Sequence, residues 1–309
     1  MLQLRYDMNH GLIMRNVYDD DQDEYFGYTL KKCISQWAYK AFSNGEEIYE
    51  VVYTTDGFRR RIIGLTNIDA TKHILLFGDS LTFGEGLSDN ETLQYFLQKD
   101  MSEYVVYNYA VSGYGPQHML ALLETDKLPQ EVKERGGVGI YIYFGPYNMR
   151  RLIGSASTPW IYKSPHYMLD THQQIIRKGS FLSDRSAITQ TYSIYWNLLN
   201  YSTFLKLINI DLPITMSDKN VLLMYKLIEQ TKVLYEKQFN GRFYVFIHPF
   251  TYYSREVLEV IQLLKTNHIP VLEYTNDVTS DIYKITGDEH PNGVLNKNIS
   301  SYFVTELSR

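Results

Sequence analysis

The stretch HILLFGDSLTFGEGLSDNE, residues 73–91, carries the signals that decide the fold of this chain. Its uninterrupted apolar residues 74–77 are typical of a strand buried on both faces, and Gly78 predicts a tight turn directly after that strand. Ser80 follows within the turn. Ligands of open parallel sheets bind outside the carboxyl ends of the strands, so a serine delivered there is a candidate nucleophile. Gly-Asp-Ser is also a common loop tripeptide. The hypothesis that Ser80 is a nucleophile therefore needs support from the rest of the chain.

From residue 73 onward, segments with the apolar pattern of strands alternate with segments that have the period of helices. Strands are expected over 74–77, 104–111, 138–144, 242–248 and 270–274. Helices are expected over 93–97, 117–124, 220–239, 257–264 and 294–307, the first of them opened by the capping-box pattern of Ser88 and Glu91. Such alternation predicts an α/β fold with a central, mostly parallel five-stranded sheet and helices on both faces.

Two parts of the chain lack this alternation. Residues 1–72 combine an acidic loop at 19–24 with short extended segments and turn signals, which predicts a small β-rich N-terminal attachment. The acidic loop does not have the spacing of a calcium loop. Residues 73–309 form the predicted catalytic domain, interrupted at about 147–218 by an insertion rich in Trp and Tyr and expected to be helical over 196–208. Ordinary packing explains these aromatic residues better than stacking on sugar rings.

Composition narrows the class of protein. The chain has 309 residues, of which 44% are hydrophobic and 21% charged, as in an ordinary globular protein. A net charge of −5 gives no basic footprint for nucleic acid. A single cysteine, Cys33, excludes an internal disulfide and a cysteine-based zinc site. No run reaches the ~18 apolar residues of a membrane span, and the sequence begins without the apolar core of a signal peptide. A cytoplasmic location is the default, and an extracytoplasmic one follows if a leader was trimmed.

Polar residues and glycines follow several of the expected strands. The loop after the second strand contains Gly113, which lets a backbone amide approach a ligand closely. Asn148 follows the third strand and offers an amide donor. Just before the closing helix lie Asp288 and His290, a carboxylate and the side chain best suited to accept a serine proton near neutral pH. Parallel strands end at one edge of the sheet, so these loops are expected to converge on Ser80.

With these residues in these positions, the chain resembles the SGNH hydrolases, also called GDSL esterases and lipases. Residues 78–81, Gly-Asp-Ser-Leu, match the block that holds the nucleophile of that family, at Ser80. Residues 108–115 match the second block, with its glycine at Gly113, and His290 matches the general base. The resemblance covers about residues 73–309 and implies a flavodoxin-like three-layer sandwich. It also implies a serine esterase that works without metal or organic cofactor.

The chain departs from the family pattern at two blocks. The third block is usually Gly-x-Asn-Asp, whereas here two residues separate Gly145 from Asn148. Asn148 stays a candidate oxyanion donor beside Gly113, because a turn can absorb one extra residue. The last block is usually Asp-x-x-His, but Gly287 occupies that aspartate position. Asp288 can orient His290 only if a turn brings them together, and a Ser-His pair helped by Glu289 or a backbone carbonyl is the alternative.

The resemblance implies acyl transfer through a covalent ester on Ser80, with His290 as base. The backbone amides of Ser80 and Gly113 and the side chain of Asn148 are the expected oxyanion donors. We expect short acyl groups, chiefly acetyl on a carbohydrate, because the insertion has no long aliphatic run to line an acyl tunnel. Two alternatives stay open: a glycan O-acyltransferase that uses the same intermediate, and a catalytically silent glycan-binding protein. His248, at the end of the fourth expected strand, fits a structural histidine better than a pocket residue. The oligomeric state stays open.

Overall fold

The computed structural model describes residues 4–7, 11–14, 17–19, 25–184, 190–191, 194–195, 197–198, 201–202 and 212–308. Most of the helix expected over 196–208 and most of the acidic loop over 19–24 lie outside these residues.

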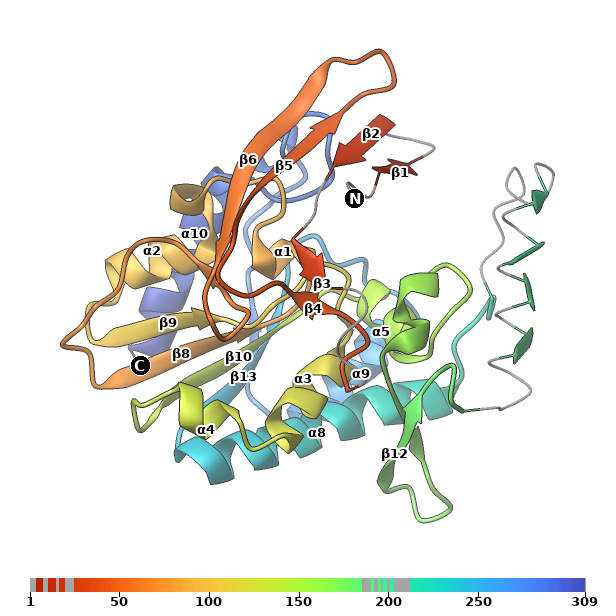
Figure 1. Cartoon of the computed structure of the whole chain (residues 1–309). Coiled ribbons are helices and arrows are strands. Elements are labelled where there is room, and N and C mark those ends of the chain that lie inside the picture. The colour runs from red at the N-terminus through yellow and green to blue at the C-terminus, as the bar shows by residue number, and fades with distance from the viewer. Residues whose placement is uncertain are drawn as a thin grey trace.

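Five parallel strands form the centre of the molecule (Figure 1). In the order of the sheet they are β9 (Tyr104–Asn108), β8 (Lys72–Phe77), β10 (Gly137–Tyr143), β13 (Arg242–Ile247) and β14 (Val271–Glu273). Numbered along the chain, this order is 2-1-3-4-5, the order of flavodoxin-like sheets. The prediction of an α/β fold with five mostly parallel strands is confirmed. The second strand ends three residues earlier than expected, at Asn108, and the residues after it form the loop that contains Gly113.

Helices cover both faces of these strands (Figure 1). One face carries α2 (Leu93–Asp100) and α10 (Gly293–Leu307), and the other carries α3 (Pro116–Glu124), α8 (Asp218–Phe239) and α9 (Arg255–Thr266). Strand β8 shows why two layers of helices are needed. Its side chains alternate, with Ile74 and Leu76 in the core beneath α2 and α10, and Leu75 and Phe77 in the core beneath α3, α8 and α9.

One local detail differs from expectation. The capping box of Ser88 and Glu91 opens the short 3₁₀ helix η1 (Asp89–Glu91), and α2 begins after it with Thr92 as its own cap. Two adjacent cap signals in the sequence therefore serve two helices.

Strands from the first 72 residues extend the same sheet. Antiparallel β1 (Leu4–Asp7), β2 (Gly11–Met14), β5 (Ser35–Ala41), β6 (Glu47–Thr55) and β7 (Arg61–Ile62) continue it to ten strands. The two parts meet where Arg61 of β7 pairs with Asn108 of β9. Strands β3 (Tyr18–Asp19) and β4 (Thr29–Leu30) pair separately. The domain boundary at residue 72 stays a prediction.

The remaining elements are short. Helix α1 (Ser80–Phe83) follows β8, α4 (Leu128–Glu131) precedes β10, and η3 (Asp281–Tyr283) precedes α10. The region predicted as an insertion begins with α5 (Tyr147–Leu152) and η2 (Pro159–Lys163). An antiparallel hairpin follows, made of β11 (Pro165–Leu169) and β12 (Ile175–Ser180).

Candidate active site

Ser80 is the first residue of α1, directly after the turn that ends β8. Gly78 is required in this turn, because a Cβ atom there would lie 2.1 Å from Oγ1 of Thr82. Asp79 caps the helix by accepting a hydrogen bond from the N–H of Leu81 at 3.1 Å. The Ser80 hydroxyl is thereby fixed at the carboxyl edge of the parallel sheet.

His290 lies opposite the serine. Its Nε2 is 2.8 Å from Oγ of Ser80, and its Nδ1 is 2.5 Å from Oδ1 of Asp288. The two-residue separation is bridged by a compact turn, in which the N–H of Asp288 donates to the carbonyl of Ile285. Gly287 allows this turn, because its φ is +78° and a Cβ there would lie 2.2 Å from the Phe42 ring. Serine, imidazole and carboxylate thus form one hydrogen-bonded chain.

The neighbouring carboxylate, Glu289, points elsewhere. It forms an ion pair with Lys284 at 2.7 Å, and its side chain is 80% exposed. Asp288, by contrast, is buried and touches both His290 and Lys40, whose Nζ lies 2.8 Å from Oδ2. Burial alone would raise the pKa of the Asp288 carboxyl, but the hydrogen bonds and charges of His290 and Lys40 outweigh it, so the pKa lies well below its usual range. Asp288 is therefore ionised at neutral pH.

Asp79 connects the serine turn to α5. Its buried carboxylate forms an ion pair with Arg151 and accepts a hydrogen bond from Nδ2 of Asn148 at 3.1 Å. The carbonyl oxygen of the Asn148 side chain accepts from the Tyr141 hydroxyl and from the N–H of Phe144. Asn148 is thus held next to the serine turn, with one amide hydrogen bonded to Asp79 and the second not used in these contacts.

Gly113 lies in the loop after β9 with φ +84°, a conformation that favours glycine. Two aromatic side chains hold this loop. The Tyr28 hydroxyl donates to the carbonyl of Ser112, and the indole N–H of Trp160 donates to the carbonyl of Gly113, each at 3.0 Å. Within the described residues, the N–H groups of Ser80 and Gly113 donate to no other protein group. Both amides are consequently available to an external acceptor.

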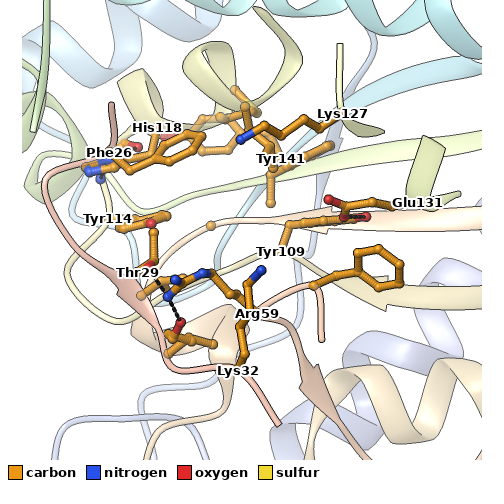
Figure 2. Close-up of a pocket in the computed structure, with 18 of the residues that line it drawn as sticks. Phe26, Thr29, Lys32, Arg59, Tyr109, Tyr114, His118, Lys127, Glu131 and Tyr141 are labelled. Atoms are coloured by element: carbon orange, nitrogen blue, oxygen red, sulfur yellow. Dashed lines mark hydrogen bonds between the residues drawn. The ribbon is translucent and has the colours of Figure 1, made fainter. Parts of the chain in front are cut away.

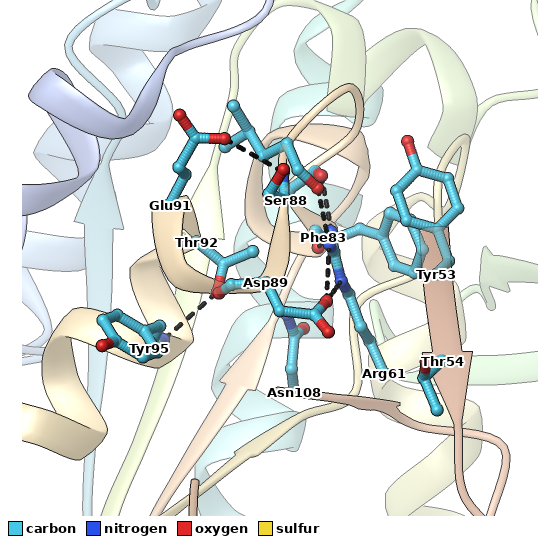
Figure 3. A network of polar contacts seen from close by, with 12 residues as sticks. Tyr53, Thr54, Arg61, Phe83, Ser88, Asp89, Glu91, Thr92, Tyr95 and Asn108 are labelled. Atoms are coloured by element: carbon cyan, nitrogen blue, oxygen red, sulfur yellow. Dashed lines mark hydrogen bonds and ion pairs between the residues drawn. The ribbon is translucent and has the colours of Figure 1, made fainter. Parts of the chain in front are cut away.

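A buried arginine from β7 holds the loop that follows Ser80. The guanidinium of Arg61 donates to the carbonyls of Phe83, Gly84 and Leu87 at 2.6 to 3.0 Å. It also pairs with Asp89 at 3.0 Å, and its side chain is fully buried (Figure 3). Five N–H donors in a rigid fork suit this arrangement, because two carbonyls at the end of α1 and one in the following loop accept hydrogen bonds from the same side chain.

His248 lies close to the site but is neutral. It follows β13, is buried, and accepts a hydrogen bond from the N–H of Phe250 through Nδ1. Burial, with a further contribution from the charge of His290, lowers the pKa of His248 to about 3 despite the opposing charge of Asp79. This placement fits the expected structural role and adds a neutral wall beside His290.

A separate cavity of about 170 Å³ lies between the N-terminal segment and α3 (Figure 2). Apolar and aromatic side chains form most of its lining, and the charged side chains of Lys32, Arg59, Lys127 and Glu131 contribute the rest together with Thr29 and His118. Gly78 reaches this cavity, but Ser80, Asp288 and His290 are not among the lining residues. The hydrogen-bonded chain therefore faces a different space.

Among the residues that the structure describes, no group of three or more His, Cys, Asp or Glu side chains is arranged to hold a metal ion. In that same part of the chain, no helix combines the length and apolar character that a membrane crossing requires.

Sequence reasoning missed the three cations that hold the site: Lys40, Arg61 and Arg151. Arg61 belongs to the short arginine triplet 59–61, which matches no motif that points to the site. Lys40 carries no such signal in the sequence, because it alternates with Gln36 and Ala38 on one face of the strand while two aromatic residues lie on the other face. Arg151 follows Asn148 by three residues, the spacing of neighbours on one helical face.

Comparison with known proteins gives no sequence match: no family model matches the chain, and no curated protein matches it. Solved structures do match, at low similarity. One is the psychrotrophic esterase EstA from Pseudoalteromonas, 14% identical over 77% of this chain and 100% of that one, with a TM-score of 0.40. A lipolytic G-D-S-L family protein from Veillonella parvula is 14% identical over 76% of this chain and 97% of that one, at a TM-score of 0.41. TesA is 13% identical over 76% and 98%, at a TM-score of 0.42. The fold assignment rests on the strand order of the central sheet.

Proposed function

We propose that this protein is a serine esterase of the SGNH hydrolase type. The observation that carries the proposal is the hydrogen-bonded chain from Ser80 through His290 to Asp288, with distances of 2.8 and 2.5 Å. Hydroxyl, imidazole and ionised carboxylate in this order are the parts of a serine triad. A silent binding protein has no need to keep all three in contact.

In the proposed reaction, His290 removes the proton from Ser80 as its oxygen attacks an ester carbonyl. The imidazolium then gives that proton to the departing alcohol, which leaves an acyl group on the serine. His290 next removes a proton from water, and the resulting hydroxide attacks the acyl-enzyme. Breakdown releases the acid and restores Ser80. Asp288 keeps the imidazole in the required tautomer and stabilises its charged form.

The negative oxygen of the tetrahedral intermediate needs donors that are already in place. We assign this role to the N–H groups of Ser80 and Gly113, which are unused within the described protein. The second amide hydrogen of Asn148 is the third donor, because Asp79 holds the first one and thereby fixes the amide.

For the substrate we propose a short acyl ester, chiefly acetyl, on a carbohydrate. The support is Trp160, which binds the carbonyl of Gly113 through its indole N–H while its side chain stays partly exposed. A partly exposed indole beside an oxyanion donor can stack on a sugar ring. A sugar hydroxyl in place of water would make the same acyl-enzyme a transferase.

The decisive experiment is labelling with a fluorophosphonate, followed by peptide mass spectrometry. The adduct is expected on Ser80, and Ser80→Ala should abolish both the labelling and ester hydrolysis. Ser88→Ala, at an exposed serine in the same loop, is the matched control and should behave as the parent. An adduct on Ser88 or Ser112, or no adduct at all, would refute the assignment.

Substrate preference is measured with p-nitrophenyl esters from acetyl to dodecanoyl. We expect kcat/KM to fall as the chain lengthens, and a steady rise would contradict the short-acyl proposal. Product analysis with a sugar acceptor present distinguishes hydrolysis from transfer.

A further inference from the structure

Lys40 is a buried lysine, and a buried lysine almost always has a charged or polar partner. It lies on β5, and its side chain is 8% exposed. Its Nζ lies 2.8 Å from Oδ2 of Asp288, a residue 248 positions further along the chain. Removing a lysine ammonium and a carboxylate from water is costly, so a pair in this position calls for a specific role.

We propose that Lys40 is a positioning residue of the triad, which fixes the outer oxygen of the Asp288 carboxylate and reduces the negative charge that His290 senses. This inference rests on the proposed function, because it assigns Lys40 a part in the same site. It also assigns a function to the N-terminal strands: they complete the site that the parallel sheet presents.

The positioning argument follows from the two oxygens of the carboxylate. Oδ1 of Asp288 accepts from Nδ1 of His290 and from the backbone N–H of the same residue, at 2.5 and 2.8 Å. Oδ2 is held by Lys40. With both oxygens bound, the carboxylate plane cannot rotate without breaking a charged hydrogen bond. Phe42, two residues beyond Lys40, packs against Gly287 and keeps β5 in contact with this turn.

The electrostatic argument concerns the proton affinity of His290. The charge of Asp288 favours the imidazolium, and the charge of Lys40 opposes part of that effect. Other groups that face His290 are the Ser80 hydroxyl on α1 and the neutral His248 after β13, whose pKa senses the charge of His290. Glu289 is adjacent in sequence but is paired with Lys284. Loss of Lys40 should therefore raise the pKa of His290.

The test compares Lys40→Met and Lys40→Arg with the parent protein, using p-nitrophenyl acetate over a range of pH. For Lys40→Met we expect the acidic limb of kcat/KM to move up by about one pH unit and the plateau to fall about tenfold. Lys40→Arg keeps the charge and should restore the position of the limb. Lys72→Met removes an exposed lysine, paired with Glu103, and should leave the profile unchanged.

A second measurement needs no turnover. Histidine ring signals are followed by NMR in isotope-labelled protein, with His290→Gln to identify the signal of His290. Its pKa should be higher in Lys40→Met than in the parent. If Lys40→Met does not fold, Lys40→Gln keeps a donor to Asp288 without the charge and should show the same shift.

The outcomes separate the two proposals. An unchanged pKa of His290 together with an unchanged profile in a folded Lys40→Met or Lys40→Gln variant would overturn the role of Lys40. Absence of a fluorophosphonate adduct in the parent, with the NMR shift still present, would overturn the esterase proposal and leave the coupling of Lys40 to His290 established.

Discussion

The two halves of the ten-stranded sheet contribute to the site in different ways. The parallel half presents short polar side chains in loops at strand or helix ends, with Ser80 after β8 and His290 before α10. The antiparallel half contributes long cations from within its strands, Lys40 on β5 and Arg61 on β7. The proposed reacting groups therefore come from one half, whereas two of the three cations that hold their loops, Lys40 and Arg61, come from the other.

This difference has a physical basis. Parallel strands bring successive loops to one edge, where small side chains can meet at hydrogen-bond distance. The loops themselves present backbone carbonyls and a carboxylate oxygen that can accept further hydrogen bonds. Long cations can reach these acceptors from a neighbouring layer while their stems pack against apolar surface. An N-terminal segment that looked like an attachment in the sequence is thus in contact with the centre of the site.

The largest expected effect concerns Asp288, which contacts His290 as well as Lys40 from the antiparallel half. Asp288→Asn should lower kcat by about 10³- to 10⁴-fold, because the amide disfavours the tautomer that His290 needs. Steady-state kinetics measures the loss, which should remain smaller than that of Ser80→Ala. Glu289→Gln is the control and should be close to the parent, since the exposed Glu289 side chain pairs with Lys284 and not with His290. An inactive Glu289→Gln beside an unaffected Asp288→Asn would reverse the assignment.

The next effect concerns stability. Arg61→Met should lower the free energy of unfolding by about 3–5 kcal/mol, because it leaves three loop carbonyls and Asp89 without their buried partner. Urea denaturation followed by circular dichroism gives the value. Arg255→Met removes an arginine whose ion pairs are exposed and should cost less than about 0.5 kcal/mol. Equal losses in the two variants would show that the antiparallel half does not hold the serine loop.

The next prediction concerns the pH dependence of stability that buried His118 causes. His118 is fully buried on α3, with its ring stacked on Tyr114, and burial lowers its pKa to about 3. In the unfolded chain this histidine has an ordinary pKa of about 6.5. As the pH falls, the imidazole is therefore protonated in the unfolded chain before it is protonated in the folded protein. Stability should therefore decline below about pH 6.5, by about 2 kcal/mol at pH 5 from this residue.

His118→Gln should remove that contribution, so that the free energy of unfolding falls less steeply between pH 7 and 5. Urea titrations at several pH values measure both slopes. Identical slopes in the variant and the parent would mean that His118 is not kept neutral by burial.

The smallest effect concerns one hydroxyl from the N-terminal segment. Tyr28→Phe removes the hydrogen bond to the carbonyl of Ser112 and should cost about 1 kcal/mol of stability. Because Gly113 follows directly, kcat should also fall a few-fold while KM changes little. Tyr252→Phe, at an exposed tyrosine, is the control. A change in KM alone would place Tyr28 in substrate binding instead of loop support.

The sequence by itself determined the parallel half and the candidates within it. Local patterns sufficed there: an uninterrupted apolar strand before Ser80, periodic helices on both sides, and motif blocks in a fixed order. These are short-range signals, and parallel topology then brings the strand ends together without further information. The resemblance to SGNH hydrolases rested on the same residues.

Only the tertiary structure decided which groups surround them. Lys40 and Asp288 lie 248 positions apart, and no local pattern links a lysine in a strand to a distant carboxylate. The same holds for Phe42, whose ring occupies the space that Gly287 leaves empty, and for Arg61, which binds carbonyls that any sequence would offer. No residue pattern in the sequence indicates which backbone carbonyls will accept a side-chain hydrogen bond or where a ring will find space to pack. Their partners become visible only when the sheet has brought the two halves of the chain together.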